Sequence, residues 1–153
     1  MIEPAAAVEE SRRGVQRVPA AAAISATAHP GEPLLVTRID QPHGDYYLVP
    51  WEDERGIVLV VQVNAWTGAA AAVVPFPTPQ RRLVMSPDEA RSAASARLAT
   101  AVIAEPRLVW QPSRESASAL MPLYQVITAN GDNAFVAADG SVFRSLTPFG
   151  RGG

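Results

Sequence analysis

Two hexapeptides, "VNAWTG" at residues 63–68 and "FVAADG" at residues 135–140, decide the fold of this chain. Each follows an apolar run and ends in a glycine, Gly68 or Gly140. A tight β-turn needs positive φ at one position, and glycine reaches that conformation without the steric cost of a Cβ atom. The same strand-closing turn written twice in one small chain predicts an internal duplication.

The residues before the first hexapeptide favour two helices and then strands. Residues 4–16 and 19–28 are rich in alanine, and Pro19 separates them because proline breaks the interior hydrogen bonding of a helix. "HPGEP" at 29–33 then stops helix formation. Runs rich in β-branched and aromatic residues follow, separated by Gly, Asp or Pro. They predict a four-strand meander over residues 34–39, 46–51, 56–66 and 69–76.

The same order returns before the second hexapeptide. Ser86 is placed as an N-cap, Pro87 as the first helical residue and Glu89 as the partner that completes a capping box. The helix is expected to run until Glu105 and Pro106 end it. A second set of short strands is then predicted at residues 107–111, 122–129, 133–138 and 141–146, with a tight hairpin at "NGDN", residues 130–133.

These patterns predict an α+β protein of two helix-plus-meander units packed together. A unit of about 60 to 70 residues is only marginally stable alone, so we expect the copies to share a core or a continuous sheet. The expected divisions are an N-terminal arm (1–18), helical or disordered, a first repeat (19–75), a proline-rich linker (76–85), a second repeat (86–147) and a flexible tail (148–153).

The repeated unit resembles the PepSY domain. The resemblance rests on a helix followed by "Y-x-V", at residues 47–49 and 124–126, and by the turn hexapeptides. The first copy has a broken helix, and the second has Val136 opposite the Asn64 of the first. PepSY-like domains are small, usually extracytoplasmic and associated with protease propeptides and protease regulation. The resemblance therefore implies a binding or inhibitory module that carries no catalytic residues.

The composition excludes several classes of protein. A hydrophobic fraction of 48% is ordinary for a soluble globular protein, and a formal net charge of −2 offers no positive field to collect nucleic acid. The chain has no cysteine, which excludes disulfides, thiolate metal sites and cysteine nucleophiles. The acidic N-terminal stretch does not resemble a signal peptide, and the apolar runs are too short for membrane insertion. The compartment stays open: extracytoplasmic if a leader was removed, otherwise cytoplasmic.

Catalytic and metal chemistry finds little support in the sequence. Asp40, His43 and Asp45 could converge on a cation, and residues 52–54 form an acidic run, but solvent-exposed loops explain both. The serines at 113, 116 and 118 have no histidine near them in sequence. We therefore expect no catalytic residue, no metal site and no cofactor.

The aromatic residues are the candidate contacts with a partner. Tyr46, Trp51, Trp66 and Trp110 lie on predicted strands or at strand ends. Tyr46 and Tyr47 are adjacent, so we expect them on opposite faces of a strand, with one near the surface. Trp66 is either an exposed anchor of the kind that dominates binding interfaces or is packed between the two copies.

The favoured hypothesis is a non-catalytic protein-interaction module that binds or inhibits a protein partner, with a peptidase as the class that the resemblance implies. One alternative is a structural subunit that forms a homo-oligomer or filament through strand edges and the N-terminal arm. A third is a small metal-dependent hydrolase, which would require bound metal.

Overall fold

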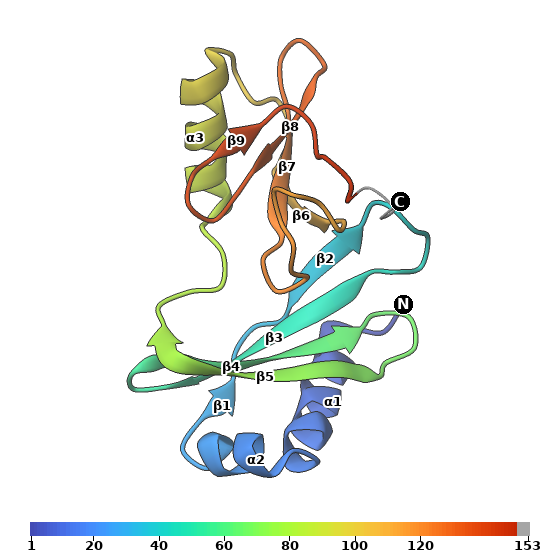
Figure 1. The fold of residues 1–153 in the computed structure, drawn as a ribbon, viewed down its shortest axis with the longest axis vertical. Helices are drawn as coiled ribbons and strands as arrows, with labels where there is room; N and C mark the ends of the chain where they lie inside the picture. The colour runs from blue at the N-terminus through green and yellow to red at the C-terminus, as the bar shows by residue number, and fades with distance from the viewer. Residues whose placement is uncertain (150–153) are drawn as a thin grey trace. The chain divides into compact units, whose positions relative to one another are not determined.

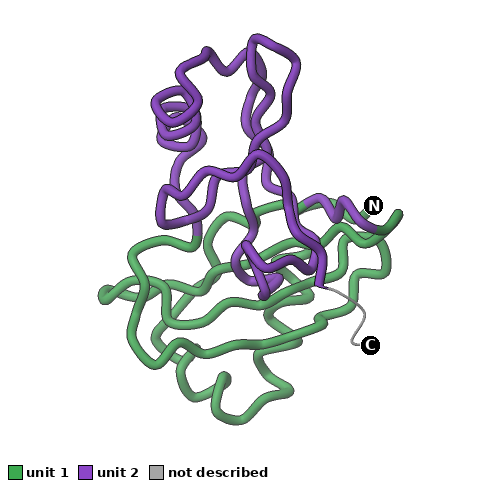
Figure 2. Tube along the Cα trace, turned by 45° about the horizontal axis from the view of Figure 1, so that its top comes forward, with its two compact units in different colours: residues 1–36, 41–83 green, residues 37–40, 84–153 purple. Residues whose placement is uncertain are grey.

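The computed structural model describes residues 1–149 and divides the chain into two compact units (Figure 2). Unit 1 contains residues 1–36 and 41–83, and unit 2 contains residues 37–40 and those from 84 onward. Both units combine helices with a sheet in which nearly all strand pairs are antiparallel, so the predicted α+β class is confirmed.

Unit 1 places its helices on one face of an antiparallel sheet (Figure 1). Its elements are α1 (Pro4–Gln16), α2 (Pro19–Ser25), β1 (His29–Pro30), most of β2 (Leu34–Arg38), β3 (Tyr46–Asp53), β4 (Gly56–Asn64) and β5 (Ala70–Gln80). The sheet order is β5–β4–β3, and β1 and β2 both pair with β3 on its other edge.

The core of unit 1 forms where α1 and α2 cover the sheet. Small residues on α1 allow a close approach: a Cβ atom added at Gly14 would lie 3.0 Å from the Cβ of Ala70 in β5. Alternation along each strand sends every second side chain to this helix-covered face. The fully or nearly buried members of the cluster are Ala7, Val15, Ala21, Tyr47, Val49, Trp51, Leu59, Val61, Val63 and Ala65.

Unit 2 contains one helix followed by four strands. Its strands are ordered β6–β7–β8–β9, all antiparallel, and Thr37 and Arg38 at the end of β2 pair with β6 in parallel. The helix packs on β7 and β8 through Ala90 and Ala94, both fully buried. The elements are α3 (Pro87–Leu98), β6 (Arg107–Trp110), β7 (Leu123–Ile127), β8 (Asn133–Val136) and β9 (Val142–Phe143).

Three boundaries differ from those expected from the sequence. Residues 1–18 are not an appended arm, because α1 contributes Ala7 and Val15 to the core of unit 1. Residues 76–80 are not a linker, because β5 extends to Gln80 and pairs there with Ile57. The first strand begins earlier than predicted, because His29 and Pro30 form β1, which pairs with β3.

The end of α3 also differs. The helix ends at Leu98 and not at Glu105, because Ala99 takes a left-handed conformation with φ of 53°. Residues 101–103 then leave the helix and run beside the end of β7, where Val102 pairs with Thr128. At the N-terminus of α3, Ser86 is the N-cap as predicted: its hydroxyl accepts the Glu89 amide proton at 3.2 Å, and the same hydroxyl donates to the Glu89 carboxylate at 3.2 Å.

Part of the predicted tail is tied to the body of unit 2. Pro148 pairs with Ser113, and the Arg114 amide donates to the Thr147 carbonyl at 2.9 Å. The remainder of that tail, residues 150–153, lies outside the described residues. Over residues 1–149, no helix combines the length and the apolar character that a membrane span requires.

Candidate interaction site

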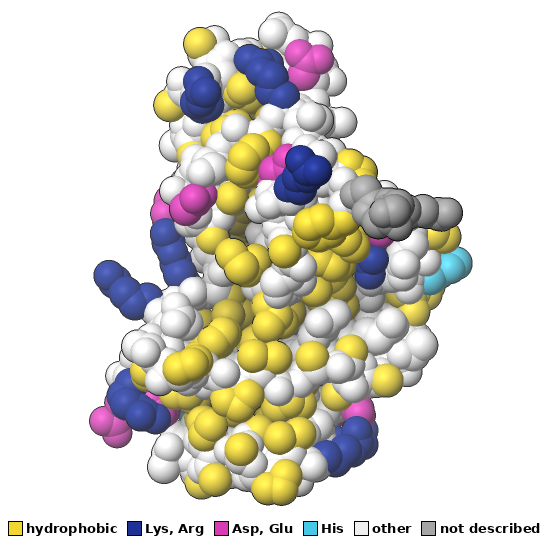
Figure 3. Space-filling model, in the orientation of Figure 1, with side chains coloured by type: hydrophobic (Ala, Val, Ile, Leu, Met, Phe, Trp, Pro, Cys, Tyr) yellow, Lys and Arg dark blue, Asp and Glu magenta, His cyan; other side chains and the backbone are white. Residues whose placement is uncertain are grey.

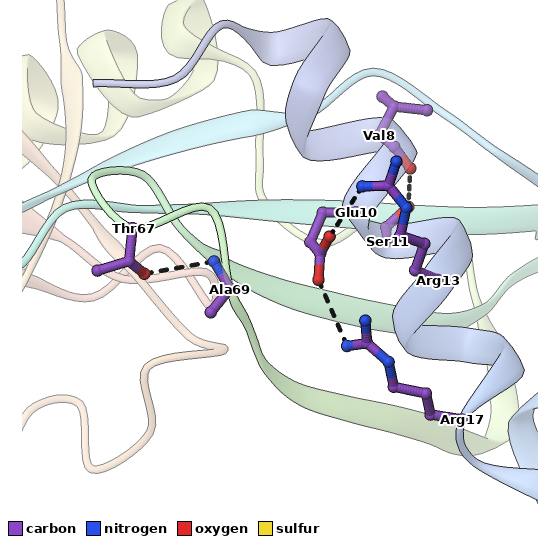
Figure 4. Close-up of polar contacts among 7 residues, drawn as sticks. All are labelled: Val8, Glu10, Ser11, Arg13, Arg17, Thr67 and Ala69. Atoms are coloured by element: carbon purple, nitrogen blue, oxygen red, sulfur yellow. Dashed lines mark hydrogen bonds and ion pairs between the residues drawn. The ribbon is translucent and has the colours of Figure 1, made fainter.

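The turn after β4 presents the chain's exposed tryptophan. β4 ends at Asn64, whose side-chain oxygen accepts the amide protons of Trp66 and Thr67, both at 2.8 Å. The Gly68 amide donates to the Asn64 carbonyl at 2.9 Å, and Gly68 has the positive φ, 76°, that this turn needs. Thr67 then accepts the Ala69 amide proton at 3.3 Å (Figure 4). These bonds hold the backbone that carries Trp66 in one conformation.

Two side chains from the loop before β3 hold the Trp66 ring. The indole N–H donates to the Asp45 carboxylate at 3.4 Å. The His43 ring meets the indole edge to face, with centroids 4.4 Å apart and planes at 76°. Trp66 nevertheless stays 43% exposed. The result is a large aromatic surface that faces water while its orientation is fixed.

The loop itself is held in a strained conformation. His43 has a φ of 58°, which costs a residue with a Cβ atom about 1–2 kcal/mol. The Ala65 amide donates to the Asp45 carbonyl at 2.9 Å and ties the loop to the turn. Strained residues persist where the surrounding structure fixes them, and they gather at functional sites. This observation marks the His43 loop as part of the candidate site.

The other three aromatic candidates do not offer a contact surface. Tyr46, Trp51 and Trp110 are 2%, 4% and 7% exposed. The Trp51 indole N–H donates to the Ser11 hydroxyl at 3.3 Å, and the Trp110 indole N–H donates to the Ser116 hydroxyl at 3.2 Å. These three side chains are structural, and the prediction that they bind a partner does not fit their burial.

The expectation that Tyr46 or Tyr47 lies near the surface is wrong. Both are buried, at 2% and 3% exposed, because β3 is covered on both faces over its first six residues. Alternation along a strand states only that two neighbours point to opposite faces. It does not state whether each face is covered.

The polar clusters considered for chemistry are engaged in local contacts. Asp40 pairs with Arg38 at 2.6 Å. In the acidic run, hydrogen bonds from Arg55 lower the pKa of Asp53 below its ordinary range. Among residues 1–149, no three His, Asp or Glu side chains come together as a set that could hold a metal ion.

The serines of the loop before β7 support backbone structure. Ser116 is 4% exposed, and its hydroxyl donates to the Met121 carbonyl at 2.5 Å. The Ser113 hydroxyl accepts the Ser116 amide proton at 3.2 Å. In the same loop, Glu115 accepts hydrogen bonds from the amide and the hydroxyl of Thr147, which lower the pKa of Glu115. These contacts are those of a packed loop.

The open edge of unit 1 is β5, and its sequence hinders strand addition. The strand carries Pro75, Pro77 and Pro79, which lack the N–H that an added strand would use, and its pairing with β4 is irregular at two places. Figure 3 shows hydrophobic side chains over the region of β5 and α2. This edge does not favour the oligomer or filament alternative.

Each unit contains a hydrogen bond from a tyrosine hydroxyl to a backbone carbonyl that the sequence did not predict. The Tyr47 hydroxyl donates to the Ile2 carbonyl at 3.0 Å, and the Tyr124 hydroxyl donates to the Met85 carbonyl at 2.7 Å. Each carbonyl belongs to the residue before a helix N-cap, and each helix has proline in its first turn. The local signal is the pattern of an apolar residue two positions before a proline, which occurs at the start of both helices.

The strand register corrects one expected correspondence between the two hexapeptides. Val63 lies opposite Tyr47, and Val136 lies opposite Tyr124. The register therefore does not support the expected alignment of Asn64 with Val136, because Val136 is paired with its tyrosine as Val63 is. The second turn is one residue shorter, and Gly140 closes it with a φ of 88°.

Comparison with known proteins yields no relative for this chain. No family model, no curated protein and no solved structure matches it.

Proposed function

We propose that this chain is a non-catalytic protein-interaction module built from two related PepSY-like units, and that the Trp66 turn is its main contact with a protein partner. A peptidase is the partner class that the PepSY resemblance suggests. The observation that carries the proposal is the exposed, fixed indole of Trp66. A fixed aromatic side chain gives up little conformational entropy on binding, and tryptophan is among the residues most enriched in binding hot spots.

The relation between the units rests on equivalent contacts. In each unit, a tyrosine hydroxyl bonds the carbonyl two residues before the first proline of a helix. Counting from those prolines, Ala7 corresponds to Ala90 and Ser11 to Ala94, and all four are fully buried. The strand partners also correspond: Leu35 and Val63 flank Tyr47, and Leu108 and Val136 flank Tyr124.

The experiment compares capture of partners by full-length variants immobilised at equal density. Extract from the native cells is passed over the wild-type chain, Trp66→Ala and Ile103→Ala, and the bound proteins are quantified by mass spectrometry. Ile103 is the matched control because its side chain is 63% exposed and lies in unit 2. Loss of a hot-spot side chain weakens binding about 30-fold, so we expect Trp66→Ala alone to lose the partner.

The peptidase assignment has its own readout. Captured material is eluted and assayed for peptide hydrolysis with and without added wild-type chain. Inhibition by the wild-type chain and weaker inhibition by Trp66→Ala support a peptidase partner. Equal capture by the wild-type chain and Trp66→Ala would contradict the role of Trp66.

A further inference from the structure

The chain contains two Arg-Arg pairs whose backbones differ. Arg12 and Arg13 lie within α1, whereas Arg81 and Arg82 lie in the connection between β5 and α3. All four residues are exposed. Residues 81–86 belong to no helix or strand. The same dipeptide is therefore presented once on a helix and once on an irregular segment.

The helical pair is protected by its backbone. An endopeptidase binds its substrate as an extended chain, and a helix must unfold before it can take that form. Unfolding α1 would remove Ala7 and Val15 from the core of unit 1. Arg13 also pairs with Glu10 at 3.2 Å (Figure 4). Because opening this helix disrupts a core, we expect the first pair to resist cleavage.

The second pair lies at the end of a weakly held span. β5 is in register with β4 at Pro75 and next at Gln80, and the pairing is irregular between these two positions. The two prolines in between have no N–H to donate to a neighbouring strand. Local opening of residues 76–83 therefore breaks one registered pair, Gln80 with Ile57.

This span carries no part of the apolar clusters beneath α1 and α3. Residues 76–83 belong neither to the cluster that α1 covers nor to the cluster that α3 covers. The chain is anchored again directly afterwards, because Val84 packs against the cluster of unit 2 and the Met85 carbonyl accepts the Tyr124 hydroxyl proton at 2.7 Å. The span can open while both cores stay intact, which is the condition for selective cleavage.

We infer that the connection at Arg81 and Arg82 is a cleavage site for an endopeptidase that selects arginine. A carboxylate in the specificity pocket of such an enzyme pairs with the guanidinium group of the substrate. Hydrolysis breaks the peptide bond after Arg81 or Arg82 and consumes one water: the arginine gains the new carboxylate, and the next residue gains the new amine. This inference goes beyond the proposed function, because it does not involve the Trp66 turn.

The cut leaves the two fragments joined, because unit 2 includes residues 37–40 from the chain before the cut. Thr37 and Arg38 pair with β6, and the Ile39 amide donates to the Trp110 carbonyl at 3.1 Å. The guanidinium carbon of Arg38 lies 4.7 Å from the centroid of the Trp110 ring. The product is therefore a protein of two fragments, in which the first contributes a strand to unit 2.

The test incubates the full chain with trypsin, an endopeptidase of this specificity, and follows the products by intact mass spectrometry. We expect the first cut after Arg81 or Arg82, about tenfold or more faster than a cut after Arg12 or Arg13, because the irregular span opens at a lower cost than the helix. On gel filtration, the two fragments should elute together in native buffer and apart in denaturing urea.

Two double variants locate the site. Arg81→Gln with Arg82→Gln should slow the first cut by about tenfold or more, because the remaining arginines lie in better-held segments. Arg12→Gln with Arg13→Gln makes the same change at the other pair and should leave the rate of the first cut unchanged. Thermal unfolding of both variants confirms that each is folded.

The same variants test cleavage in the native cells, with the chain tagged at both ends. We expect a fragment whose amino terminus is Arg82 or Leu83, and its loss when both arginines of the connection are replaced. A first trypsin cut elsewhere would overturn the inference, and so would recovery of the intact chain alone from the cells. Neither result affects partner capture by Trp66, so failure of this inference and failure of the proposed function can be told apart.

Discussion

The turn after β4 and the turn after β8 each contain a glycine with positive φ, but they differ in length and in the side chains they expose. Gly68 has a φ of 76° and donates to the Asn64 carbonyl four residues back, whereas Gly140 has a φ of 88° and donates to the Ala137 carbonyl three residues back. In the first turn Asn64 holds the backbone and Trp66 faces solvent. In the second, the Asp139 carboxylate accepts the Ser141 amide proton at 2.9 Å, and no large side chain is displayed. Glycine fixes the shape of each turn, so the intervening positions are available for function.

β4 and β8 each begin at a hairpin, after β3 and β7. The comparison of these two hairpins predicts the largest effect on stability. A Cβ atom at Gly56, where φ is 126°, would lie 2.6 Å from the Gln80 carbonyl oxygen. At Gly131, with φ of 82°, it would meet nothing within 4 Å. We expect Gly56→Ala to cost more than about 3 kcal/mol of unfolding free energy and Gly131→Ala about 1–2 kcal/mol.

Urea unfolding of the two glycine variants measures this difference. Gly131→Asn serves as the control, because asparagine tolerates positive φ better than alanine. Equal losses for Gly56→Ala and Gly131→Ala would mean that the contact between β5 and the first hairpin yields easily.

The hydrogen bonds of Tyr47 and Tyr124 predict the next largest effect on stability. Tyr124→Phe leaves the Met85 carbonyl without its buried donor, and we expect a loss of about 1–2 kcal/mol. Tyr47→Phe should cost about 1 kcal/mol, because the Ile2 contact is only partly buried. If the units are equivalent, both variants destabilise. A neutral Tyr47→Phe would mark the first contact as incidental.

The Tyr47 contact also has a pH signature. Burial, followed by the charge of Glu3, raises the pKa of Tyr47 above its ordinary value of 10.0. A raised pKa in the folded state stabilises the fold below pH 10, and this stability is lost as the pH rises toward the folded pKa. The stability difference between the wild-type chain and Tyr47→Phe should therefore shrink above pH 10. Urea unfolding at pH 8 and pH 10.5 tests this.

A comparison of Trp51 in unit 1 with Thr128 in unit 2 predicts a substitution that raises stability. Trp51, opposite Pro30, has its indole N–H bonded to Ser11. Thr128, opposite Val102, lies four residues after Tyr124, as Trp51 lies four residues after Tyr47. The Thr128 hydroxyl is buried with no hydrogen-bond partner among the described residues. Thr128→Val removes that hydroxyl at nearly constant volume, so we expect about 1 kcal/mol of added stability.

Thermal unfolding of Thr128→Val and Ser11→Ala checks this comparison. Ser11→Ala leaves the buried Trp51 N–H without an acceptor and should lower the stability by about 1–2 kcal/mol. Opposite signs support the assignment of one satisfied and one unsatisfied position. A Thr128→Val variant less stable than the wild-type chain would contradict it.

The features predicted from sequence are those with local causes. Proline favours the starts of α1 and α3, and glycine favours both turns, so the sequence alone predicts these positions. The burial of Trp110 and the bond from Tyr124 to Met85 depend on residues distant in sequence. Alternation could place Trp66 at a strand end, but only the fold determines that Asp45 and His43 meet it.

The smallest expected effect on stability is at the C-terminal end of α3. It tests whether the local sequence or a tertiary contact sets the end of a helix. The C-cap residue of α1, Arg17, has an ordinary right-handed conformation, whereas the C-cap residue of α3, Ala99, has a φ of 53°. Alanine has no local preference for that conformation, so the pairing of Val102 with Thr128 imposes it. Ala99→Gly relieves the strain while it adds freedom to the unfolded chain, and we expect a net gain of about 0.5–1 kcal/mol. Arg17→Gly, without strain to relieve, should destabilise. If urea unfolding instead shows a loss for Ala99→Gly, the left-handed residue does not strain the chain, and the helix ends there for a local reason.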